Sequence, residues 1–263
     1  MGAAHARLRP QAARRRTLTM TLVAEPVVET PETRRWPYMR PKDAATLIVI
    51  DRSCATPKVL MGKRHAGHKF MPGKFVFPGG RLEPGDRRMV AAGALHDIDE
   101  RRLAAQVVRP SGGLGRALAL AAIRETFEET GLLIGDASYG APESAPAGVW
   151  EAFCAHGVFP ALEPLHFISR AITPPNRPKR FDTRFFAVDA DAIAKRIDGV
   201  VGADSELTEL VWIPLPEAPT LDLPPITHTV LKELERRIEA GFGRHLPVWR
   251  RAKLNGKWLT TEL

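Results

Sequence analysis

Residues 121–131 read AAIRETFEETG, the most distinctive stretch of this 263-residue chain. They end a helical pattern that begins at residue 114, and Gly131 follows in the position that a C-cap glycine favours. At about 100° per residue, three glutamates share one face within one turn: Glu125, Glu128 and Glu129. Apolar side chains fall on the opposite face: Leu120, Ile123 and Phe127. The stretch therefore predicts a helix with one acidic face and one face that packs.

The acidic face needs a compensating charge, because like charges three or four positions apart destabilise a helix by roughly a few tenths of a kcal/mol per pair. A hard divalent cation supplies that charge, since Mg²⁺ and Mn²⁺ prefer oxygen ligands and bridge to substrate phosphates. Arg124 can pair with Glu128 at i, i+4 and hold it in one rotamer. The alternative is a solvated acidic face that pairs with scattered arginines.

The other patterned segments predict strands on both sides of this helix, with a second long helix near the end of the chain. Residues 45–51 and 58–64 predict a hairpin, and residues 75–77 a strand that ends in the turn Pro78-Gly79-Gly80. Residues 87–110 are helical in pieces, and a short helix is expected at 149–156. Further strands are expected at 165–172, 183–188 and 207–213, and an amphipathic helix at 226–240. This order predicts an α+β fold or α/β/α sandwich.

The composition is that of an ordinary globular protein, with 44% hydrophobic and 26% charged residues. No apolar run approaches the roughly 18 residues of a membrane-spanning helix, so we expect no membrane partner. The net charge is +8, but residues 1–24 hold five arginines and no acid, and the remaining 33 basic residues face 30 acidic ones. The basic charge therefore belongs largely to the first residues, and we expect no nucleic-acid partner.

We expect three regions: a disordered basic tail and linker at 1–43, one domain at 44–245 and a C-terminal extension at 246–263. Cys54 and Cys154 have no partner spacing, so a reducing, cytoplasmic location is expected. The Arg-rich start leaves open organellar targeting, and a faint twin-arginine pattern is broken by Thr19 and Thr21. Another alternative is that Met20 is the true start.

Residues 124–132, RETFEETGL, resemble the second half of the Nudix box, which reads Arg-Glu-U-x-Glu-Glu-x-Gly-U with U aliphatic. Gly80, five residues and Asp86 resemble its first half, with Asp in place of Glu. Between Asp86 and Arg124 lie 37 residues where the box has seven, so we expect an insertion at 87–116 that loops out before the helix. The resemblance covers roughly residues 44–240. It implies a Nudix-type α/β/α sandwich with a mixed central sheet and a helical insertion.

The segment before the box resembles the coenzyme A pyrophosphatase branch of this family. Residues 60–65, LMGKRH, are followed at the spacing of that branch by Lys69, Gly73 and the sequence FPGG at 77–80. Gly62, His65 and Lys69 depart from its preferred residue types, although Lys69 keeps the charge. The insertion and the later RFDTRFF at 180–186 resemble the nudix-type 19 group within the branch.

The resemblance implies roles for residues of this chain. The Mg²⁺ or Mn²⁺ ligands would be Glu125, Glu128, Glu129 and a carbonyl at Gly79. The catalytic residues would be Glu125, Glu128 and Arg124, which orients the glutamates. Asp86 would support its loop or reach a metal through water. The substrate-binding residues would be Arg64, Lys69, Gly80 and Arg180.

The activity implied is hydrolysis of a pyrophosphate bond in a nucleoside diphosphate linked to another group, foremost coenzyme A or acyl-coenzyme A. The products would be 3',5'-ADP and a phosphopantetheine, so the partner is a nucleotide-containing small molecule. The general base is Glu125 or a residue of a later loop, for which the candidates are Asp182, Glu206 and Glu209. A basic loop with Arg177, Lys179 and Arg180 is either a site for the 3'-phosphate or a solvated loop.

Three alternatives remain open from the sequence. One is a Nudix diphosphatase that acts on ADP-ribose or NADH. Another is a non-catalytic, nucleotide-sensing module on the same scaffold, which the intact glutamates disfavour. A homodimer is left open as well.

Overall fold

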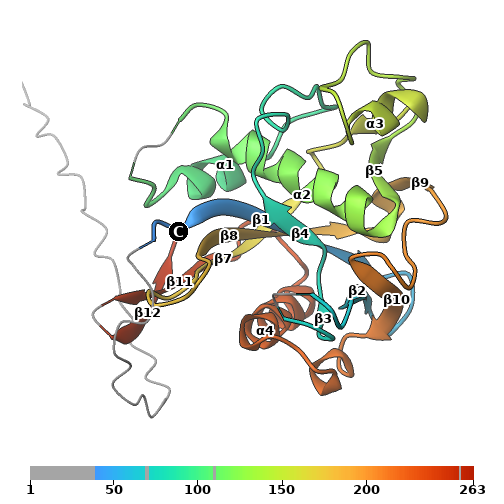
Figure 1. The fold of residues 1–263 in the computed structure, drawn as a ribbon. Coiled ribbons are helices and arrows are strands. Elements are labelled where there is room, and N and C mark those ends of the chain that lie inside the picture. Colours follow the sequence, from blue (N-terminus) through green and yellow to red (C-terminus); the bar gives the residue numbers. More distant parts are fainter. Residues whose placement is uncertain (1–38, 69–70, 109–110, 255) are drawn as a thin grey trace, which may run out of the picture.

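The computed structural model describes residues 39–68, 71–108, 111–254 and 256–263, and it places them in a mixed sheet with helices on both faces (Figure 1). Helices α1 (Asp97–Ala104) and α2 (Leu114–Thr130) lie over one face. Helix α4 (Pro225–Glu239) lies against the other face. The layers confirm the α/β/α sandwich expected from the sequence.

The main sheet runs in the order β10-β2-β1-β8-β7-β11-β12, and β3 and β4 pair with β2 and β1. Its strands are β1 (Lys42–Asp51), β2 (Lys58–Arg64), β3 (Phe75–Val76), β4 (Gly79–Arg81), β7 (His166–Ile172), β8 (Phe181–Asp189), β10 (Leu207–Pro214), β11 (Trp249–Leu254) and β12 (Lys257–Glu262). The pairs β1–β8 and β7–β11 are parallel, and the other pairs in this sheet are antiparallel. The central sheet is therefore mixed, as expected.

Strand β1 supplies both hydrophobic cores, because successive side chains of a strand point to opposite faces. Leu47 and Val49 join the core beneath α2, whereas Ile48 and Ile50 join the core against α4. All four side chains are fully buried. A central strand that is apolar on both faces fits a sheet covered by helices on both sides.

Helix α2 ends at Gly131, whose φ is +74° and whose N–H donates to the Phe127 carbonyl at 2.8 Å. A Cβ at Gly131 would lie 2.2 Å from the carbonyl oxygen of Ile197, so only glycine fits this helix end. Leu120 and Ile123 are fully buried, as the helical periodicity predicts. The glycine stop thus fixes where the acidic turn of α2 ends.

Smaller elements surround the end of α2. A three-stranded sheet runs in the order β6 (Phe159–Pro160), β5 (Leu132–Asp136) and β9 (Ile193–Arg196). The short helix α3 (Glu151–Ala155) lies within the expected range 149–156. Two 3-10 helices, η1 (Ala190–Ala192) and η2 (Ala218–Thr220), complete the described elements. The small sheet was not predicted from the sequence.

The segment 87–116 contains α1 and the start of α2, and its described part packs on the core rather than extending away from it. Met89, Leu95 and Leu103 are buried in the core beneath α2. Of the helical pieces expected at 87–110, the structure places one helix, α1, in the described part. That this segment is an insertion relative to other family members stays a prediction.

The residues after 245, expected to form a C-terminal extension, lie at the edge of the main sheet. Strand β11 pairs with β7, where Trp249 faces Ser169, and β12 pairs with β11. Residues 1–38, which hold most of the expected tail, lie outside the described residues. Within the described part of the chain, no helix is long and apolar enough to cross a membrane.

Candidate active site

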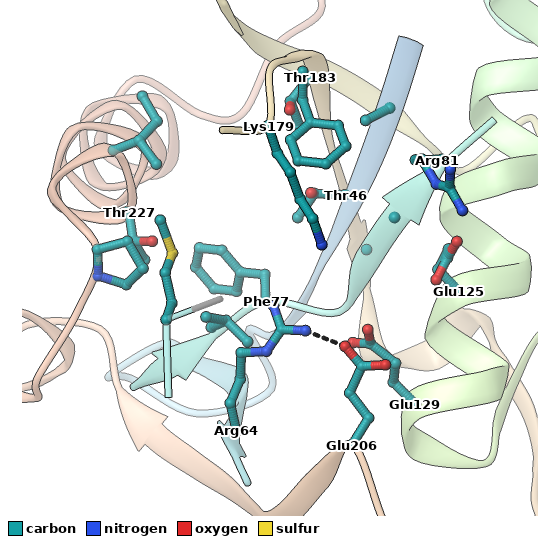
Figure 2. Close-up of a pocket in the computed structure, with 18 of the residues that line it drawn as sticks. Thr46, Arg64, Phe77, Arg81, Glu125, Glu129, Lys179, Thr183, Glu206 and Thr227 are labelled. Carbon is teal, nitrogen blue, oxygen red and sulfur yellow. Dashed lines mark hydrogen bonds and ion pairs between the residues drawn. The ribbon is translucent and has the colours of Figure 1, made fainter. Parts of the chain in front are cut away.

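A cavity of about 700 Å³ lies between α2, strands β1, β4 and β8, and the start of α4 (Figure 2). Its lining includes three kinds of side chain besides four threonines. Acidic side chains line one end: Glu83, Glu125, Glu129 and Glu206. Basic side chains line it as well: Arg64, His68, Arg81 and Lys179, with Arg81 beside Glu125 (Figure 2). Apolar side chains complete the three kinds: Met71, Val76, Phe77, Phe181, Phe185 and Ile226.

Glu125 and Glu129 stand one turn apart on α2 and both line the acidic end of the cavity (Figure 2). Burial raises the pKa of Glu125 to about 7; Arg124 opposes this, and Glu128 and Glu206 add to it. Burial, followed by the charges of Glu206 and Glu125, raises the pKa of Glu129 well above its ordinary value. Two carboxylates are therefore held close together where water screens them poorly.

Glycines of β4 make room for these carboxylates. A Cβ at Gly80 would lie 2.2 Å from Oε1 of Glu125, so only a residue without a side chain allows this carboxylate to rest against β4. The Gly79 N–H donates to Glu129 and partly opposes the rise in its pKa. Gly79 itself pairs with Thr46 of β1. The turn expected at residues 78–80 thus continues as β4, which brings both glycines against the acidic turn of α2.

Arg124 is buried behind the acidic turn and joins three carboxylates. Its Nε donates to Asp86 Oδ1 at 2.8 Å, its Nη1 donates to Glu128 Oε2 at 2.8 Å, and Nη1 lies 3.1 Å from Glu125 Oε1. Burial alone would lower the pKa of Arg124, but Asp86, Glu125 and Glu128 raise it above its ordinary value. The i, i+4 contact with Glu128 predicted from the sequence is present.

Asp86 is fully buried and lies in the loop after β4. One of its oxygens accepts from Arg124 and from the indole N–H of Trp150, the latter at 3.2 Å. The other accepts from the backbone N–H of Glu83 at 2.8 Å. Of the two roles that the sequence left open, support of the loop matches this position.

Glu128 does not line the cavity. Its carboxylate is held by Arg124, and its side chain is 32% exposed. Burial raises the pKa of Glu128, Arg124 lowers it, and Glu83 raises it. Arg124 Nη1 lies 2.8 Å from Glu128 and 3.1 Å from Glu125, so the arginine holds Glu128 near Glu125 but outside the lining of the cavity. A metal-binding or catalytic role for Glu128 stays a prediction.

Two of the four predicted substrate-binding residues line the cavity. Arg64 and Gly80 line the cavity, and Lys69 lies outside the described residues. Arg180 donates to the carbonyls of Thr173 at 3.0 Å and Met39 at 2.6 Å, and it does not line the cavity. Its neighbour on the same loop, Lys179, lines the cavity instead (Figure 2).

Of the candidate bases from later loops, only Glu206 lines the cavity among the described residues. Asp182 accepts two hydrogen bonds from Arg170, at 2.8 and 2.7 Å. Glu209 is exposed on β10. His68 lines the cavity near Arg64, whereas His65 accepts a hydrogen bond from the Gly67 N–H at 2.9 Å.

Sequence reasoning missed Glu83 and Trp150. Glu83 lies within the Gly80–Asp86 motif, three positions before Asp86, so its place near the site was open to local reasoning. Trp150 meets Asp86 across 64 positions of sequence and belongs to no motif of the chain. The apolar wall was missed for a related reason, because its residues come from β3, β8, α4 and the loops between them. Helical spacing placed the glutamates of α2 together, and the resemblance named Arg64 and the two glycines.

The acidic end has the donor chemistry that a hard divalent cation requires. Glu206 raises the pKa of both Glu125 and Glu129, and Glu125 raises that of Glu129, so negative charge is crowded at this end of the cavity. Carboxylate oxygens are the ligands that Mg²⁺ and Mn²⁺ prefer. Among the described residues, no three His, Cys, Asp or Glu side chains already surround a single point. The residues therefore suit a hard cation by the kind of atom they offer, and a cation site formed by them stays a prediction.

A comparison with solved structures finds Nudix proteins. The NUDIX hydrolase from Alicyclobacillus acidocaldarius is 30% identical, with a TM-score of 0.54, and the match covers 73% of this chain and 90% of that chain. The NUDIX domain of Shewanella oneidensis NrtR, solved with ADP ribose, is 11% identical with a TM-score of 0.43 over 76% of this chain and 90% of that one.

No family model matches the chain, and the curated proteins give no significant match. The first structural match is nevertheless 30% identical and spans nine-tenths of a Nudix hydrolase. Together with the layered fold, it shows that this chain belongs to the Nudix hydrolase family.

Proposed function

We propose that this Nudix hydrolase cleaves the diphosphate of coenzyme A or an acyl-coenzyme A. Water adds its oxygen to one phosphorus, the bridging P–O bond breaks, and the second phosphate leaves with its pantetheine arm. The products are 3',5'-ADP and phosphopantetheine or its acyl form. The resemblance of residues 60–80 to the coenzyme A branch supports this substrate.

The observation that carries the proposal is the combination of three different walls in one cavity. The acidic end suits a cation and a diphosphate, and Arg64 and Lys179 suit additional phosphate oxygens. No ion pair to Lys179 is present among the described residues, so its charge is available to a ligand. The apolar wall with Phe77, Phe185 and Ile226 suits a long, uncharged arm better than a second charged nucleotide.

The roles follow from position. Glu125 and Glu129, with the Gly79 carbonyl and a rotated Glu128, would hold Mg²⁺ or Mn²⁺. Such a cation neutralises phosphate charge and makes a bound water more acidic. Arg124 keeps the glutamates in place from behind.

Substrate contacts fall to residues on the other walls. Arg64 and Gly80 line the cavity beside the acidic end, and Lys179 takes the part expected of Arg180. Lys69 stays a predicted phosphate contact. Glu206 is favoured as general base over Asp182 and Glu209, because it alone of the three faces the cavity.

The proposal is tested by incubating the protein and Mn²⁺ with a panel of coenzyme A, acyl-coenzyme A, ADP-ribose, NADH and diadenosine polyphosphates. We expect 3',5'-ADP to form fastest from the coenzyme A compounds. Brisk cleavage of ADP-ribose without turnover of coenzyme A would overturn the substrate assignment. The Glu129→Gln variant should lose turnover, because it removes a charge from the acidic end; binding without turnover by the unmodified protein would instead indicate a sensing module.

A further inference from the structure

Arg64 and Glu206 form an ion pair at the boundary between the basic and acidic walls of the cavity (Figure 2). Nη2 of Arg64 donates to Glu206 Oε1 and lies 3.4 Å from Nδ1 of His68. The Nε–H of Arg64 is buried and finds no hydrogen-bond partner among the residues that the structure describes. The guanidinium therefore has donor capacity left over while it holds the carboxylate.

The backbone fixes where this pair forms. Leu207, the first residue of β10, pairs with Arg64 at the end of β2, and the carbonyl of Glu206 accepts from the His65 N–H at 3.0 Å. Both main chains are thus held by strand pairing. A change of partner by either side chain needs only rotation about side-chain bonds, because the Glu206 side chain is 41% exposed.

The charge of Glu206 also acts on the two carboxylates at the acidic end of the cavity. After burial, its charge is the largest influence that raises the pKa of Glu129, and it raises the pKa of Glu125 as well. Arg64 acts on Glu129 in the opposite direction. Three carboxylates thus meet at one end of the cavity, and Arg64 satisfies one of them.

We propose that the Arg64–Glu206 ion pair is exchangeable, and that its exchange couples cation binding to phosphate binding. When a divalent cation joins Glu125 and Glu129, Glu206 turns from Arg64 toward the cation, directly or through water. Arg64 is then free to donate to an anionic phosphate. Each ligand removes a competitor of the other, so the two bind with positive cooperativity. The inference rests on the proposed cation site and does not depend on the identity of the substrate.

The competing explanation is a permanent ion pair that fastens the loop before β10 to β2. The two explanations differ in how Mn²⁺ binding responds when Arg64 is removed. An exchangeable pair holds Glu206 back from the cation, so removal of Arg64 should release it. A permanent fastening should leave Glu206 out of cation binding altogether.

The test is a double-mutant cycle with Mn²⁺ alone, its binding followed by the electron paramagnetic resonance signal of the free ion. Arg64→Gln should tighten Mn²⁺ binding by about fivefold or more, and Glu206→Gln should weaken it. Lys179→Met is the matched control, because it removes a positive charge from the same cavity without releasing a paired carboxylate. In the Glu206→Gln background, the gain from Arg64→Gln should shrink to that of Lys179→Met.

Equal gains from Arg64→Gln in both backgrounds would reduce the effect to general electrostatics and overturn the proposal. Weaker Mn²⁺ binding by Arg64→Gln would also overturn it, because the pair would then be a fastening. Thermal unfolding of each variant checks that it folds. If Arg64→Gln does not fold, the unmodified protein crystallised with Mn²⁺ and methylenediphosphonate, whose P–C–P link resists hydrolysis, answers the same question: Glu206 must have left Arg64.

These measurements separate the inference from the proposed function. Binding of Mn²⁺ needs no turnover, so a failure to cleave coenzyme A would remove the substrate assignment and leave the cycle interpretable. Conversely, Mn²⁺ affinity unchanged by Glu206→Gln would refute the exchange even in an enzyme that cleaves coenzyme A.

Discussion

Asp86 and Arg124 form an ion pair in the interior of the protein, with Arg124 Nε 2.8 Å from Asp86 Oδ1. The Asp86 side chain is 0% exposed and the Arg124 side chain 4%. Asp86 belongs to the loop after β4, and Arg124 belongs to α2. The pair therefore fastens the strand that carries Gly79 and Gly80 to the helix that carries the glutamates. The shorter Asp side chain suffices here because the guanidinium reaches it directly and Trp150 shares the same oxygen.

The first prediction concerns the stability that this pair provides. Replacement of Asp86 by Ala should lower the free energy of unfolding by about 3 kcal/mol, because it takes a fully buried carboxylate from the buried guanidinium and leaves it the more exposed Glu125 and Glu128. Urea denaturation followed by circular dichroism measures the loss. Asp189→Ala is the control, since its pair with Arg52 is about one-third exposed and should contribute only about 0–1 kcal/mol. Similar losses in both variants would contradict the argument.

The acidic helix could be predicted because its causes are local. Helical periodicity places Glu125 and Glu129 on one face, and Gly131 ends the helix through its own backbone conformation. The strands β1 and β2 were likewise predicted from short apolar runs, and their antiparallel pairing is present. Each of these inferences needs only residues within a few positions of one another.

The rest of the site depends on contacts between distant parts of the chain, which periodicity does not contain. Glu206 reaches the cavity because β10 pairs with β2, and Trp150 meets Asp86 across 64 positions of sequence. Lys179 and Arg180 are adjacent in the segment before β8, but Lys179 lines the cavity whereas Arg180 donates to the carbonyls of Thr173 and Met39. The sequence identified the basic loop, and a substrate contact by Arg180 stays a prediction, because Lys179 is the residue of this pair that lines the cavity.

The second prediction concerns acid stability and His166. Burial, with a smaller contribution from Arg244, lowers the pKa of His166 to about 4. Below pH 6.5 this histidine is protonated in the unfolded chain, but in the folded protein it stays neutral down to about pH 4. The free energy of unfolding therefore falls as the pH falls from 6.5 to 4. At pH 5 the loss should reach about 2 kcal/mol relative to neutral pH. His166→Phe, which can still pack against Phe242, should lack this loss when unfolding at pH 5 and pH 7.5 is compared.

The third prediction concerns Glu125, for which stability changes with pH in the opposite direction. Its pKa of about 7 means that the folded protein keeps a proton which the unfolded chain releases near pH 4.5. Stability without divalent cations should therefore decline as the pH rises from 4.5 to 7, by up to about 3 kcal/mol, and stay level above. Urea unfolding in a chelator should show this decline relative to Glu125→Gln, which has no proton to exchange.

Addition of Mn²⁺ at pH 8 should recover the lost stability, because a cation that binds only the folded state stabilises it by mass action. The recovery should be smaller in Glu125→Gln, which offers the cation one fewer charged oxygen. Parallel pH curves for the two proteins, or equal stabilisation by Mn²⁺, would show that Glu125 is not held at the acidic end as the structure places it.

The fourth prediction separates the two glycines of β4. A Cβ at Gly80 meets the end of the flexible Glu125 side chain, at 2.2 Å from Oε1, which can swing aside. A Cβ at Gly79 meets backbone, at 2.6 Å from the Ala45 carbonyl oxygen and 2.8 Å from Thr46 Cα, which is held in the sheet.

Gly80→Ala should therefore keep most of its stability and weaken Mn²⁺ binding and turnover by about tenfold or more, because the carboxylate leaves its place. Gly79→Ala should lose about 1–3 kcal/mol of unfolding free energy, because the β1–β4 pairing must open. The unfolding curves should therefore show the larger loss in Gly79→Ala. A Gly80→Ala protein that unfolds as easily as Gly79→Ala yet binds Mn²⁺ normally would show that β4 does not position Glu125.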